Sequence, residues 1–75
     1  MSGHLPSCTP AQVERVLIGL GFTVDRQRGS HRILVRASDS RTIVLPWHSG
    51  ALKRGTLRAI IRATGETVAG FVARL

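Results

Sequence analysis

The chain has 75 residues, which is enough for one small domain and too few for two. Its hydrophobic content of 43% favours a packed fold and argues against a disordered protein. The formal net charge is +7, and ten of the eleven basic residues are arginines, whose planar guanidinium binds phosphate through two parallel hydrogen bonds. The charge therefore predicts an anionic partner.

The cysteine count and the lengths of the apolar runs indicate in which cellular compartment the protein works. Cys8 is the only cysteine, so no disulfide can form within the chain. No apolar run is long enough to span a membrane, and no signal sequence is recognisable, so we expect a cytoplasmic protein. Residues 1–8, which include His4, show no periodicity and are expected to form a flexible N-terminal tail. Residues 9–75 are expected to form the single domain.

A helix is predicted from the beginning of that domain. Thr9 is a good capping residue, Pro10 suits the first turn, and Gln12 stands where a capping box needs it. The apolar residues that follow lie on one helical face and are Val13, Val16, Leu17 and Leu20. Gly21 is expected to end the helix.

Three extended segments come next, at Phe22–Gln27, His31–Ala37 and Arg41–Leu45. They are rich in β-branched residues and are separated by short turns of glycine, serine and aspartate. Short connections favour antiparallel hairpins over parallel crossovers.

Two further helices complete the predicted order. One begins near Thr56 and ends at Gly65, and Thr67 can cap a final short helix. The order α-β-β-β-α-α predicts an α+β fold, with a small antiparallel three-stranded sheet and helices packed on one of its faces.

Basic residues dominate the middle of the chain. Between positions 26 and 62 there are nine basic residues and a single acid, Asp39. Aromatic residues are few, so a single-strand platform of stacked bases is a poor fit, and contact with backbone phosphates and duplex shape fits better. We expect the RNA-binding residues to be Arg26, Arg28, Ser30, Arg32, Arg36, Lys53, Arg54 and Arg58. A solvated basic surface is the alternative for the charged residues, and a turn-capping role is the alternative for Ser30.

The possible catalytic groups are few. The four carboxylates are scattered, and the histidines and Cys8 lack zinc-binding spacing, so we expect no metal site and no cofactor. RNA carries its own nucleophile, the 2′-hydroxyl, so a single imidazole can catalyse cleavage by moving protons. His31, beside Arg28 and Arg32, is the candidate. Because it shares strand parity with Ile33 and Val35, a partly buried histidine at the edge of the core is an equal alternative.

Four segments together resemble the HicA toxin family. They are Gly21-Phe22, Arg28-Gly29-Ser30-His31, Val44–His48 and Arg54–Arg62, and the resemblance covers about residues 11–75. It implies a fold similar to the double-stranded-RNA-binding domain, cleavage of mRNA that blocks translation, and a HicB-type antitoxin that covers the active site. It also implies that His31 is catalytic. Arg32 departs from the family pattern, because many members carry a second histidine or a small apolar residue there.

Three functions stay open at this point. The first is a toxin of a type II toxin–antitoxin system that acts as a metal-independent endoribonuclease through His31. The second is a non-catalytic double-stranded RNA-binding module, and the third is an interaction protein whose basic face meets an acidic partner. For protonation of the leaving oxygen we rank water ahead of His48, which is expected mainly to bond backbone groups in its loop.

Overall fold

The computed structural model describes residues 5–75 and contains six elements in the predicted order. These are α1 (Pro10–Gly19), β1 (Thr23–Arg28), β2 (His31–Arg36), β3 (Arg41–Pro46), α2 (Arg54–Thr64) and α3 (Val68–Val72). The predicted α+β class and element order are confirmed.

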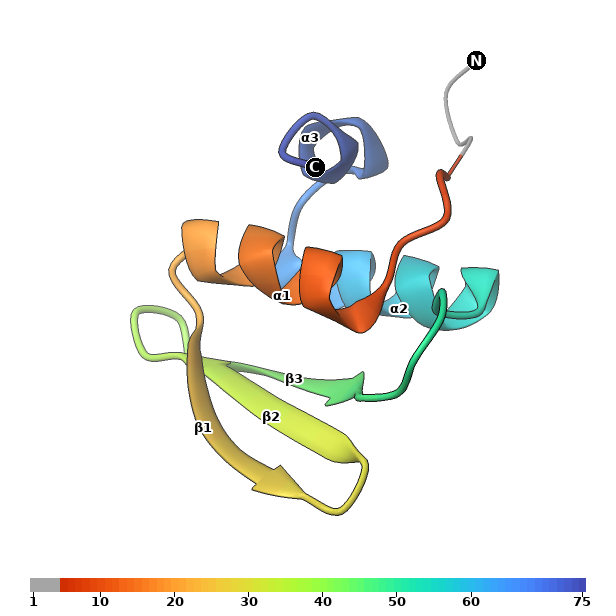
Figure 1. The fold of residues 1–75 in the computed structure, drawn as a ribbon. Helices are drawn as coiled ribbons and strands as arrows, with labels where there is room; N and C mark the ends of the chain where they lie inside the picture. Colours follow the sequence, from red (N-terminus) through yellow and green to blue (C-terminus); the bar gives the residue numbers. More distant parts are fainter. Residues whose placement is uncertain (1–4) are drawn as a thin grey trace.

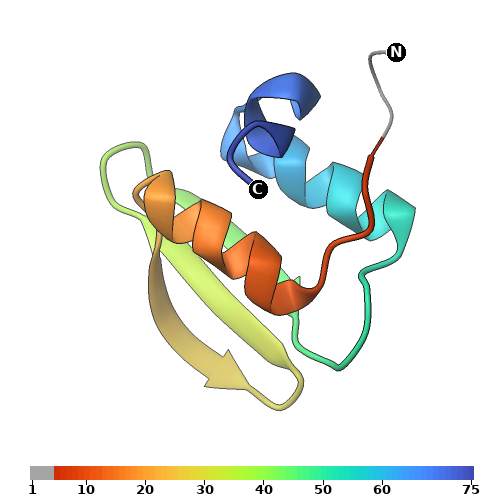
Figure 2. The ribbon, with the colours of Figure 1, turned by 45° about the horizontal axis from the view of Figure 1, so that its top comes forward.

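The three strands form one antiparallel sheet in the order β1-β2-β3. Helices α1 and α2 lie on the same side of this sheet, and α3 lies beyond them (Figures 1 and 2). No element of residues 5–75 covers the opposite face of the sheet, which we call the open face (Figures 1 and 2). The described part of the chain is therefore a helical layer on one side of a three-stranded sheet.

Helix α1 begins as the sequence predicts. Thr9 Oγ1 accepts a hydrogen bond from the Gln12 amide at 3.3 Å, and Gln12 Oε1 accepts one from the Thr9 amide at 2.9 Å. Gly21 adopts a φ of 95°, which an L-residue with a side chain rarely does. The chain can thus turn from α1 directly into β1.

The core lies between the sheet and the helices. Leu34, Ile43 and Leu45 supply the sheet side, and each is at most 2% exposed. Phe22 and Phe71 are equally buried. The helix residues that complete the main apolar cluster are Val13, Val16, Leu17, Leu57, Ile60 and Ile61.

Strand β2 alternates between the two faces of the sheet. Leu34 belongs to the core cluster, and Arg32 and Arg36 bond to groups at α1. The alternate residues His31, Ile33 and Val35 therefore occupy the open face, although Ile33 is only 9% exposed. His31 is exposed. The alternative in which His31 closes the edge of the core is wrong, because the parity that it shares with Ile33 points away from the helices.

The segment before α1 differs from the expected tail. Leu5 and Cys8 are 4% and 2% exposed and belong to the core, and the Leu52 amide donates a hydrogen bond to the Cys8 carbonyl at 2.8 Å. This part of the expected tail is packed against the domain. Its two apolar side chains have no periodicity, so the sequence held no signal for their burial. His4 lies outside the described residues.

Candidate active site and nucleic-acid interface

His31 is the first residue of β2 and directly follows the tight turn between β1 and β2. Gly29 adopts a φ of 57° in that turn, and no other group approaches the position that its β-carbon would take. Ser30 and His31 are both exposed. The sharp turn therefore places the imidazole on the open face, within reach of a large ligand.

Two arginines from β1 stand beside His31. Arg28 is its direct cross-strand partner, and Arg26 is the partner of Ile33, one pair further along the same face. Directly opposed side chains in an antiparallel pair have their β-carbons about 5 Å apart. Both arginines are exposed, and Arg26 also forms an ion pair with Asp25 at 2.6 Å. Arg28 is thus placed to share a phosphate with His31.

Arg32 points to the opposite face of the sheet. Its guanidinium donates two hydrogen bonds to the Glu14 carboxylate, at 2.8 and 3.1 Å, and two more to Gln27 Oε1. It also stacks on the ring of Trp47 with 3.6 Å between Cζ and the ring centroid. Arg32 therefore joins α1, β1 and the loop after β3 to the strand that carries His31.

The loop after β3 supports the turn from the other side. Pro46 is the cross-strand partner of His31, and the Trp47 amide donates a hydrogen bond to the Ser30 carbonyl at 2.6 Å. His48 is exposed, and its Nδ1 lies 2.9 Å from the Ser49 carbonyl oxygen, in the backbone contact that the sequence predicts. The backbone on both sides of His31 is therefore anchored.

Arg36 lies at the far end of β2 and is engaged within the protein. It donates to the Leu20 carbonyl at 2.8 Å and to the Thr64 carbonyl at 3.0 Å, which are at the ends of α1 and α2. It also forms an ion pair with Asp39 at 2.8 Å. The hydrogen bond to Asp39 raises the pKa of Arg36, and the bonds from Arg36 and Arg41 hold the pKa of Asp39 well below its usual range. Geometry thus gives Arg36 a part in joining the two helices to the sheet.

The remaining basic residues of the expected interface begin α2. Lys53 is the N-cap residue and makes no side-chain capping bond, and Arg54 is the first helical residue. Both are exposed, whereas Arg58 is half-buried. Lys53 and Arg54 lie at the helix N-terminus, where backbone amides also favour anions, and Arg58 follows one turn later. We call these three residues, separate in the chain from Arg26 and Arg28, the second basic group.

Within residues 5–75, no three side chains among the histidines, cysteine, aspartates and glutamates come together in a way that could hold a metal ion. No helix in the same part of the chain is long and apolar enough to cross a membrane.

The sequence of the chain matches the model of one protein family. The model of the family described as HicA toxin of bacterial toxin-antitoxin matches residues 10–66 of the chain. The chain belongs to the HicA toxin family. A search of curated proteins found no significant match. This HicA protein is therefore a toxin of a bacterial toxin–antitoxin system, in a family of ribonuclease-type toxins with an antitoxin partner.

Sequence reasoning missed two features of this HicA protein. The first is the contact of Arg32 with Glu14 and Trp47, and the second is the contact of Arg36 with the two helix ends. A sequence signal existed for both, since Arg32 and Arg36 share the parity of buried Leu34 and therefore face the helices.

Proposed function

We propose that this HicA toxin is a metal-independent endoribonuclease that cleaves mRNA and uses His31 as its general base. The observation that carries the proposal is the exposure of His31 on the open face, with Arg28 directly opposite it on β1. His31 makes no side-chain hydrogen bond to any of residues 5–75, so its ring nitrogens are available to substrate.

The chemistry follows from the substrate. Neutral His31 removes the proton of the ribose 2′-hydroxyl, and the resulting oxygen attacks the adjacent phosphorus. The bond from phosphorus to the 5′-oxygen breaks, and that oxygen takes a proton from water. The products are a 2′,3′-cyclic phosphate and a 5′-hydroxyl end. Arg28 stabilises the negative charge that develops on the phosphoryl oxygens.

The rest of the proposed interface binds the RNA backbone. Arg26 and Ser30 extend the surface around His31, and Lys53, Arg54 and Arg58 form the second basic group. Phosphate contacts of this kind position a nucleic acid without reading its sequence. A HicB-type antitoxin that covers the open face around His31 would block substrate access, and we propose this as the mode of inhibition.

Purified protein incubated with RNA in excess EDTA tests the proposal. We expect the wild type to cleave, and His31→Ala to lose at least about 10²-fold in rate. His48→Ala is the matched control, because it removes the other described imidazole without changing the site, and we expect it to retain most activity. Both variants should bind RNA with nearly wild-type affinity.

A second substrate sharpens the assay. An RNA with 2′-deoxyribose at the mapped cleavage position lacks the nucleophile and should remain intact at that position. Equal cleavage by wild type and His31→Ala would overturn the assignment of His31. Salt-dependent RNA binding without any cleavage by wild type would favour the double-stranded RNA-binding module.

A further inference from the structure

The two edges of the sheet differ in their protection against pairing. Edge strand β1 has an irregular register between Val24 and Arg26 and carries the charged residues Asp25, Arg26 and Arg28. Bulges and charges are the usual means by which proteins prevent a sheet edge from accepting another strand. Edge strand β3 pairs with β2 in regular register throughout, and its four central residues, 42–45, are uncharged. The β3 edge is therefore open to pairing.

The direction of the β3 backbone groups follows from one hydrogen bond. The Trp47 amide bonds to the Ser30 carbonyl, and in an antiparallel ladder such pairs alternate along the strand. Ile43 and Leu45 therefore direct their amides and carbonyls toward β2. Thr42 and Val44 direct theirs outward, where only another extended backbone can match their spacing.

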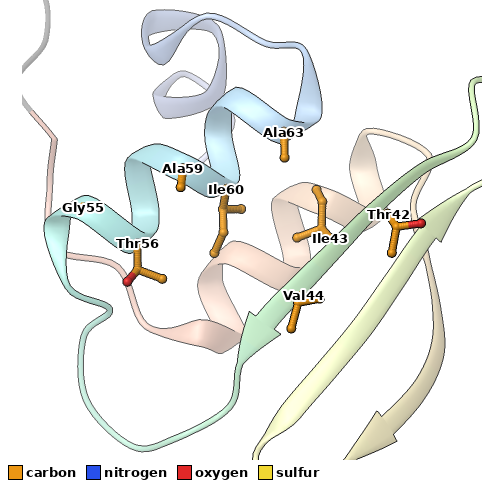
Figure 3. A pocket seen from close by; sticks show the side chains of 8 residues that line it. All are labelled: Thr42, Ile43, Val44, Gly55, Thr56, Ala59, Ile60 and Ala63. Carbon is orange, nitrogen blue, oxygen red and sulfur yellow. The ribbon is translucent and has the colours of Figure 1, made fainter.

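A groove runs beside this edge. It has a volume of about 420 Å³ and lies between β3 and α2, with Ile43 and Ile60 between the two elements (Figure 3). Five residues of α2 line the groove, and three of them, Gly55, Ala59 and Ala63, are small and recur at intervals of four, so they share a face. Small residues leave room for side chains of an added strand that point toward the helix.

The net charge of the chain indicates which kind of partner can bind the groove. The chain carries a net charge of +7, and three of its four acids, Glu14, Asp25 and Asp39, already pair with arginines. A second copy of the chain would bring two strongly positive surfaces together, whereas an acidic chain would be attracted. Arg41, which precedes Thr42 in β3, donates a hydrogen bond to the carbonyl of groove residue Ala63 at 3.0 Å and adds positive charge at this end of the groove.

We propose that the β3 edge and its groove bind an extended segment of an acidic partner protein, which adds a fourth strand to the sheet. The outward amides and carbonyls of Thr42 and Val44 provide the pairing, and alternate apolar side chains of the segment enter the groove. Val44 is 52% exposed in the free chain and becomes covered. The proposal does not rest on RNA cleavage by His31.

A blocked peptide that alternates valine with glutamate is the probe. Added to the isotope-labelled full chain, it should slow hydrogen exchange of the Thr42 and Val44 amides at least about tenfold and shift the methyl signals of Ala59 and Ala63. The amide of Gln27 also points outward, but from the protected β1 edge, and should keep its exchange rate. A peptide with lysine in place of glutamate should bind at least about tenfold more weakly.

Ala59→Phe fills the groove and should weaken peptide binding at least about tenfold. Ala69→Phe, at an exposed alanine of α3, is the matched control and should bind like wild type. The proposal would be overturned if the Thr42 and Val44 amides did not change at millimolar peptide, or if Ala59→Phe and wild type bound the peptide equally. It would also be overturned if the same amide changes appeared on raising the protein concentration alone, or on adding an RNA oligonucleotide alone.

Discussion

The guanidinium of Arg32 stacks on the indole of Trp47 while it holds the carboxylate of Glu14. Both members of the Arg32–Glu14 ion pair are largely covered, with side chains 23% and 20% exposed. Arg32 directly follows His31 in β2, and Trp47 directly follows the cross-strand partner of His31. One side chain thus fixes the two segments that flank the proposed catalytic residue.

Replacing Arg32 therefore affects stability. Arg32→Ala removes a two-bond contact with a carboxylate and a cation–π contact, and should lower the free energy of unfolding by about 2 kcal/mol. Arg32→Lys keeps the charge but not the planar fork, and should recover only part of this loss. Urea denaturation measures both. Arg15→Ala, an exposed arginine of α1, should change stability by less than about 0.5 kcal/mol.

The salt dependence of RNA affinity distinguishes this structural role of Arg32 from a direct contact with phosphate. If Arg32 contacted phosphate, Arg32→Ala would reduce the dependence of RNA affinity on salt. We expect the salt dependence to stay unchanged, with cleavage reduced through kcat, because the turn that carries His31 loses its support. A clear fall in the salt slope for Arg32→Ala would contradict this role and restore Arg32 to the RNA interface.

Arg36→Ala should destabilise the ends of two helices at once. The guanidinium donates one hydrogen bond to the carbonyl of Leu20, the C-cap residue of α1, and one to the carbonyl of Thr64, the last residue of α2, where helical carbonyls lack partners. We expect a lower Tm than for Arg15→Ala. Hydrogen exchange should rise in the last turns of α1 and α2 and stay unchanged in the first turn of α1, which Thr9 caps. Uniform exchange changes along both helices would contradict the local role.

Asp39 gives the fold a predictable acid response. Its pKa lies well below the ordinary value of 3.8, chiefly because Arg36 donates to it and also because Arg41 does. A carboxyl with a depressed folded-state pKa stabilises the fold above its unfolded pKa and loses that effect as the pH falls toward the folded value. Unfolding free energy should therefore decrease between about pH 5 and pH 2. Asp39→Asn should flatten this decrease, and an unchanged profile would contradict the assignment.

The sequence predicted what depends on local pattern. Helix α1 was predictable because Thr9, Pro10 and Gln12 act within one turn, and the hairpins were predictable because their connections are short. The exposure of His31 was not predictable from its own residue type. It depends on which face the helices cover, and that choice follows from the burial of Leu34 against residues distant in the chain.

The candidate site divides in the same way. His31 and Arg28 stand together because one tight turn joins them, and this proximity could be read from the sequence. The parity of Arg32 and Arg36 with Leu34 indicated which face of the sheet they occupy, but not their partners. Glu14, Trp47 and Thr64 come from other elements that only the tertiary fold brings near.

Cys8 tests how tightly the segment before α1 is packed. The thiol is buried, and burial raises its pKa, so little reactive thiolate is accessible in the folded chain. We expect a thiol reagent at neutral pH to react slowly with native protein and rapidly in denaturant. Because Cys8 is the only cysteine, the signal reports this segment alone. Rapid reaction in native buffer would show instead the loose tail that the sequence suggested.

Kinetics should distinguish the two basic groups of the proposed RNA interface. Arg28 lies opposite His31, so Arg28→Gln removes stabilisation of charge in the transition state and should lower kcat by about 10²-fold. Lys53 and Arg54 lie at the start of α2, and Lys53→Gln with Arg54→Gln should raise KM with little change in kcat. Each lost phosphate contact should also reduce the salt slope of RNA affinity by about 0.7 on single strands.

The same comparison shows whether Arg28 acts in chemistry or only in binding. Arg28→Lys keeps a positive charge but loses the bidentate fork of the guanidinium. Compared with Arg28→Gln, its salt slope should therefore return closer to the wild-type value than its kcat does. Arg15→Gln, exposed on α1, controls for the general loss of positive charge and should leave kcat unchanged. Equal kcat losses for Arg28→Gln and the Lys53 and Arg54 double variant would place the scissile phosphate between the two groups, and the assignment of Arg28 alone to the transition state would then fail.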